Sequence, residues 1–114
     1  MGIVDTLLEN ARADTELLLL NDRHGDVLSK PREVTFLLVA QDRDKADLVA
    51  SFIGDNRYGA ATVEPYDGKF GVFVKVIMPI EQNVICSVSA LFACVAAVFS
   101  VEYDGWESEI QRAT

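Results

Sequence analysis

A stretch without any charged side chain, residues 82–100, constrains the fold of this chain more than any other feature. Its length would suit a membrane span, but Gln82, Asn83 and several serines make it too polar, and acidic residues flank it instead of basic anchors. We therefore expect a helix at residues 82–99 that is buried inside a folded domain. Its apolar stripe would consist of Val84, Val88, Leu91, Val95 and Val98.

The rear of this helix carries small residues. They are Cys86, Ala90, Ala93, Cys94 and Ala97. Small side chains let another element approach closely, so either an N-terminal helix or a second subunit is expected to cover this side. The two cysteines would lie about 12 Å apart along the helix axis, too far for a disulfide, and we expect buried free thiols.

Apolar periodicity and turn signals divide the rest of the chain into elements in a regular order. A first helix is predicted at residues 3–20, and a second begins at Asp42 and ends near Gly54. Strands are predicted at residues 33–40, 58–64, 70–78 and 100–103, with a hairpin turn at residues 65–68. The order is a helix followed by β-α-β-β-α-β, which is the ferredoxin-like pattern.

This pattern predicts an α+β fold in which two helices cover one face of an antiparallel sheet, preceded by the N-terminal helix. The strongest apolar runs belong to the first and third strands, which occupy the central positions in that topology. Residues 1–114 are expected to form a single domain, with the βαββαβ core at about 33–107.

The second face of such a sheet would carry apolar side chains without a helix above them. Leu37, Val39, Phe73 and Ile77 alternate onto it. Monomers rarely expose a large apolar patch, so either the N-terminal helix or its tail packs there, or the face forms a homodimer or a partner site. The sequence leaves these alternatives open.

The chain is acidic, with a formal net charge of −8. Nonspecific nucleic-acid binding depends on lysine and arginine, so the charge argues against direct nucleic-acid contact. It favours a basic protein partner, or serves solubility alone. The N-terminus shows no basic region before its apolar residues, and we expect a cytoplasmic protein without a secretory signal or a membrane anchor.

No catalytic constellation is visible in the sequence. His24 is the only histidine and lies in a charged loop, where a solvated side chain is expected. Asp42 and Asp44 flank Arg43, which is typical of a helix start and not of a metal site. We therefore predict a protein that is not an enzyme and needs no cofactor or metal.

Residues 101–107 read Val-Glu-Tyr-Asp-Gly-Trp-Glu and contain the only tryptophan. The first three alternate like a short strand, Asp-Gly signals a turn, and Gly105 would allow a positive φ. Trp106 then has two interpretations. It closes the end of the core while its N–H finds a partner, or it is an exposed aromatic between Asp104 and Glu107 that contacts another protein.

The Glu-Tyr-Asp-Gly-Trp sequence resembles the hallmark of the regulator of ribonuclease E activity B family, and the resemblance spans about residues 15–107. Gly25-Asp26 and Ser-Lys-Pro-Arg-Glu-Val at 29–34 look like the segment that leads into that family's first strand. At the start of this strand the chain has Thr35 and Phe36, where family members often have an acidic residue and a histidine. The resemblance implies a noncatalytic bacterial inhibitor that binds the scaffold region of ribonuclease E and alters RNA decay without touching RNA.

Partner-binding candidates follow from the same two segments. They are Arg32, Tyr103, Asp104, Trp106 and Glu107. Arg32 has a second interpretation, a local salt bridge with a carboxylate. A different hypothesis for the whole chain is a small-molecule-binding regulatory domain of ferredoxin-like fold, dimeric through the open sheet face or the uncharged helix.

Overall fold

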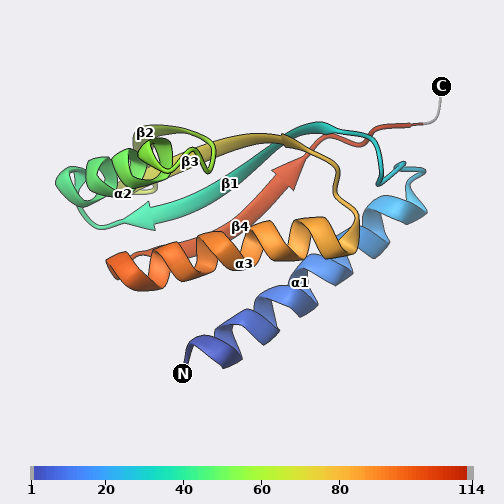
Figure 1. Ribbon diagram of the computed structural model, residues 1–114, viewed down its shortest axis with the longest axis horizontal. Coiled ribbons are helices and arrows are strands. Elements are labelled where there is room, and N and C mark those ends of the chain that lie inside the picture. Colours follow the sequence, from blue (N-terminus) through green and yellow to red (C-terminus); the bar gives the residue numbers. More distant parts are fainter. Residues whose placement is uncertain (1, 113–114) are drawn as a thin grey trace.

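A computed structural model describes residues 2–112 and has the predicted α+β architecture (Figure 1). Three helices and a four-stranded antiparallel sheet follow one another in the expected order. The elements are α1 (Ile3–Arg23), β1 (Arg32–Ala40), α2 (Arg43–Asp55), β2 (Ala60–Tyr66), β3 (Lys69–Met78), α3 (Gln82–Phe99) and β4 (Glu102–Ser108).

The sheet has the strand order β2-β3-β1-β4, so β1 and β3 are central as their apolar runs predict. Phe36 of β1 lies opposite Val74 of β3 and Trp106 of β4. The β2–β3 hairpin turns at Asp67 and Gly68, both with positive φ, as a tight two-residue turn requires. The predicted turn at 65–68 is thus confirmed at its centre, while Pro65 and Tyr66 belong to β2.

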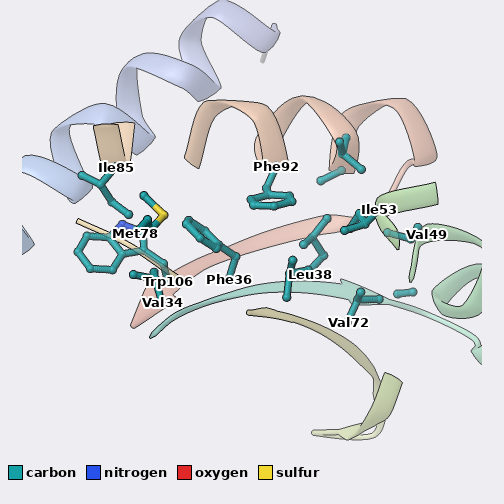
Figure 2. Close-up of a cluster of buried hydrophobic side chains, with 14 of the residues drawn as sticks. Val34, Phe36, Leu38, Val49, Ile53, Val72, Met78, Ile85, Phe92 and Trp106 are labelled. Atoms are coloured by element: carbon teal, nitrogen blue, oxygen red, sulfur yellow. The ribbon is translucent and has the colours of Figure 1, made fainter. Parts of the chain in front are cut away.

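The core lies between the sheet and the pair α2 and α3 (Figure 2). Phe36 and Phe92 are fully buried, with ring centroids 4.8 Å apart. The other large, fully buried apolar residues are Val34, Leu38, Val49, Ile53, Val72, Val74, Ile80 and Ile85. Alternate residues of β1 and β3 supply the sheet side of this core, as period-2 patterning dictates.

Helix α1 packs against α3 and not against the second sheet face (Figure 1). Gln82 of α3 donates a hydrogen bond to the Thr15 hydroxyl, 3.1 Å away. The N-terminal helix therefore covers small residues of α3, one of the two expected covers. The alternative in which this helix covers the open face of the sheet is wrong.

The apolar stripe predicted for α3 is right in part: Val95 is buried and Val84, Val88 and Leu91 pack partly buried against the core, but Val98 does not. The helix buries Ile85, Ser89, Phe92, Ala93, Val95 and Ala96, whereas Val98 is 77% exposed. A helix without charged residues has no polar side that orients it, so the large Ile85 and Phe92 side chains and the α1 contact decide the orientation. The predicted buried thiols are also wrong, because Cys94 is exposed and Cys86 only partly buried.

Length and composition alone would allow α3 to cross a membrane, and it is the single such helix among the described residues. Its buried side chains form part of the core under the sheet, Phe92 against Phe36 being the central contact. A core helix meets the same length and composition criteria as a membrane span, and this packing accounts for its apolar character.

Candidate functional site

Strand β4 continues through the Asp-Gly pair that the sequence analysis assigned to a turn. The strand runs from Glu102 to Ser108, and the predicted end at residue 103 is wrong. Trp106 pairs with Phe36 and Tyr103 with Leu38, so β4 contains one residue more than β1 in this interval, which is a β-bulge. Gly105 has the predicted positive φ, +89°. The Asp-Gly pair therefore forms a bulge inside the strand, and the strand does not end there.

The bulge has a direct consequence for the two aromatic residues of β4. In a regular strand, side chains three positions apart point to opposite faces. With the extra residue, both Tyr103 and Trp106 are on the helix-covered side, opposite the buried Leu38 and Phe36. Asp104 and Glu107 remain exposed.

Trp106 is an interior residue, 8% exposed, close to Val34 and Phe36 (Figure 2). Its ring N–H donates a hydrogen bond to Asp14 Oδ1 of α1 over 2.8 Å. The interpretation in which the ring closes the core and its N–H finds a partner is confirmed. The interpretation of Trp106 as an exposed aromatic is wrong, because the ring seals the junction between α1 and the sheet.

Asp14 carries a carboxylate into this junction and is 6% exposed. Burial raises its pKa, although hydrogen bonds from Trp106 and Ser89 oppose the shift. Ser89 also shares a 2.7 Å hydrogen bond with the Tyr103 hydroxyl, whose pKa burial raises. Asp14 is not among the site residues predicted from the sequence. A detectable signal was its spacing: Asp14 and Leu18 are one helical turn apart, so a polar residue occupies the buried stripe of α1.

Arg32 is also interior, and its local salt bridge is confirmed. Its guanidinium contacts the Asp26 carboxylate at 2.7 Å, and both side chains are almost completely buried. It also donates to the carbonyl oxygens of Val27 and Glu109. Asp26 accepts a further hydrogen bond from the backbone N–H of Gln111. The pair joins the loop before β1 to the segment after β4.

The open face of the sheet contains a groove that follows β1 and β4. Three adjoining hollows form it: the first two share Thr35 and Glu107, and the second and third share Tyr66 and Asp104. We call these hollows together the β1–β4 groove. It is lined by Arg32, Glu33, Thr35, Leu37, Val39, Tyr66, Asp67, Lys69, Phe73, Glu102, Asp104, Gly105, Trp106, Glu107, Ser108, Glu109 and Gln111.

Carboxylates dominate the charge of the β1–β4 groove. They belong to Glu33, Asp67, Glu102, Asp104, Glu107 and Glu109. The two cations of the lining already have carboxylate neighbours, since Arg32 pairs with Asp26 and Lys69 lies 3.6 Å from Glu102. The Tyr66 hydroxyl donates to Asp104 over 3.4 Å, and that carboxylate raises the pKa of Tyr66. Asp104 and Glu107 are thus the two sequence candidates that this surface presents.

Residues 2–112 contain one histidine and two free thiols as potential reactive groups. No three histidine, cysteine, aspartate or glutamate side chains gather there as a metal site. His24 and Cys94 are exposed and far apart in the chain. Burial and the Asp14 carboxylate raise the pKa of the Cys86 thiol, which disfavours the reactive thiolate.

The family model described as Regulator of ribonuclease activity B matches residues 11–108, which include α1 from its third turn and the whole sheet. The chain belongs to this family. The resemblance seen in the β4 sequence is confirmed, and a ribonuclease is the protein partner that membership in the Regulator of ribonuclease activity B family implies. No curated protein was found to match the chain.

Proposed function

We propose that this protein is a noncatalytic regulator that binds a ribonuclease of the ribonuclease E type and lowers RNA decay without contacting RNA itself. The observation that carries the proposal is an acidic, open sheet face in a member of a ribonuclease-regulator family. The regulator would act in the bacterial cytoplasm, where RNA decay takes place.

Electrostatics supports a protein contact over an RNA contact. The chain has a net charge of −8, and the β1–β4 groove concentrates carboxylates. A phosphate backbone would be repelled by this surface, because affinity for nucleic acid comes from lysine and arginine. A basic protein surface would be attracted, and the attraction would raise the rate of association.

A cleavage assay tests the proposal. A purified ribonuclease of the ribonuclease E type cleaves a fluorogenic RNA while the chain is titrated, and complex formation is followed by size-exclusion chromatography. We expect slower cleavage, co-elution with the enzyme, and no binding of the chain to the RNA alone. Unchanged cleavage without co-elution would contradict the proposal, and so would retention of RNA by the isolated chain.

A further inference from the structure

We propose that the β1–β4 groove binds an extended, lysine- and arginine-rich segment of a partner protein, with one apolar side chain of that segment seated on Leu37 and Phe73. The identity of the partner as a ribonuclease rests on the function proposed above. The binding surface and the chemistry of the segment rest on the sheet alone.

The register of β1 and β4 sets the spacing that the groove recognises. Glu107 lies opposite Thr35, and Glu102 lies opposite Val39. Leu37 is midway between these positions on the same face. Positions i, i+2 and i+4 of a strand cover about 13 Å on one face. The groove therefore offers acidic, apolar and acidic positions in turn along the strand direction.

An extended peptide has the same period of two, so it presents alternate side chains to one side. A segment with the pattern basic-x-apolar-x-basic matches the acidic, apolar and acidic positions. Its outer residues would meet Glu107 and Glu109 at one end and Glu102, Asp104 and Asp67 at the other, where the lining carboxylates outnumber the cations. Lysine and arginine at these positions form charge-assisted hydrogen bonds with carboxylates.

Two aromatic rings, those of Tyr66 and Phe73, line the centre of the groove. The rings of Tyr66 and Phe73 meet edge to face with centroids 6.0 Å apart. Below them, a Cβ added at Gly71 would come within 2.7 Å of the Phe73 ring and 3.1 Å of Leu37, so glycine lets these side chains lie close to the sheet. The hollow beside them is lined by apolar and acidic groups together. An aliphatic side chain can bury its surface here.

Charge selects a basic segment over a second copy of this chain. Two copies placed face to face would bring the same carboxylates of both grooves together, and each chain has a net charge of −8. Like charges opposed across an interface are unfavourable. A basic segment relieves this repulsion because it supplies the missing cations.

Two short fluorescent peptides test the inference. One is centred on Arg-Ser-Leu-Ser-Arg, and the other has the same composition in the order Arg-Arg-Ser-Ser-Leu. We expect the first to bind more tightly, with an affinity that falls as salt rises. The groove variant combines Asp104→Asn with Glu107→Gln, and we expect it to weaken binding of the first peptide by about tenfold, since each exposed charge pair contributes up to ~1 kcal/mol.

The matched control removes the same charge elsewhere. Glu9→Gln with Glu16→Gln alters two exposed carboxylates of α1 and leaves the groove intact. Equal weakening by both pairs, or equal affinity for the two peptides, would overturn the inference. Sedimentation of the chain as a dimer that dissociates on Phe73→Ala would also overturn it in favour of a second copy.

The same variants separate this inference from the proposed function. Loss of ribonuclease inhibition in the Asp104→Asn, Glu107→Gln variant, with inhibition retained in the α1 variant, supports both. Full inhibition by the groove variant leaves the proposed function standing and overturns the groove as its contact site. Selective peptide binding without any effect on the ribonuclease supports the groove and overturns the proposed function.

Discussion

The two faces of the sheet differ in what their polar groups do. On the helix-covered face, two internal polar pairs link the elements: Asp14 accepts from Trp106, and Ser89 bonds to Tyr103. On the open face, the carboxylates of Asp104 and Glu107 point into the β1–β4 groove. Strand β4 contributes to both faces, with Tyr103 and Trp106 on the covered one and Asp104 and Glu107 on the open one. Within residues 102–107 of this chain, the aromatic side chains therefore close the fold and the acidic side chains form surface.

The largest difference between the faces is expected for their phenylalanines. Phe36→Ala on the covered face removes a fully buried ring and should lower the free energy of unfolding by about 3–5 kcal/mol. Phe73→Ala on the open face should cost clearly less, because that ring is partly exposed. Urea denaturation of both variants measures this. Similar losses of unfolding free energy in the two variants would contradict the assignment of Phe36 to the core and of Phe73 to the groove.

Breaking the buried pair at the end of β1 should be nearly as damaging. Arg32→Ala leaves the Asp26 carboxylate buried without its cation, and such losses cost about 3–5 kcal/mol. The α1 variant Arg12→Ala is the control, since Arg12 is exposed and has no resolved pair in the described residues. A small effect of Arg32→Ala on the urea midpoint would show that the pair is dispensable.

The bulge that sends Tyr103 and Trp106 to the same face can be tested at Gly105. Gly105→Ala forces a side chain onto a residue with φ of +89°, which should cost about 1–3 kcal/mol. Space is not the cause, because no atom lies within 4 Å of the added Cβ. Gly54→Ala, in a helix with open space around it, is the matched control. Tryptophan fluorescence reports whether Trp106 stays buried.

The Asp14 carboxylate predicts a pH dependence. Its pKa is raised in the folded state, so folding favours the protonated form. That contribution is fully present below the unfolded pKa and is lost as pH rises through the folded pKa. Asp14→Asn keeps an acceptor for the Trp106 N–H without the charge. We expect it to unfold at higher urea than the parent at pH 7, with the difference vanishing at acid pH. An advantage that grows on acidification would contradict this assignment.

The smallest effect belongs to the open face. Asp104→Asn with Glu107→Gln should change the free energy of unfolding by no more than about 0.5 kcal/mol, since both side chains are exposed and outside the core. The thermal midpoint is the measurement. A drop of many degrees would mean that these acidic residues hold β4 in place, and that their part in binding could not be separated from folding.

The element order was predictable because apolar residues recur along the sequence with a different spacing in helices and in strands. The runs at residues 33–40 and 70–78 became the central strands, and the Asp42 side chain does cap α2, accepting from the Lys45 N–H at 2.8 Å. Of the candidate site residues, Asp104 and Glu107 were correctly expected at the surface. Trp106 and Arg32 are interior, and each is paired there with a carboxylate from another segment, Trp106 with Asp14 and Arg32 with Asp26.

Sequence by itself thus determined which segments are helices and strands, and that the chain as a whole is acidic. Only the tertiary structure decided which face of α3 is buried most deeply. The helix has no charged side that would orient it, so the packing of Phe92 against Phe36 sets its orientation. The tertiary structure also decided that Asp-Gly in β4 forms a bulge instead of a turn, since pairing with β1 continues on both sides of it. The contact between Tyr66 of β2 and Asp104 of β4 in the β1–β4 groove was also decided only by the tertiary structure, because it depends on how the β4 bulge and the end of β2 place two distant side chains on the same face.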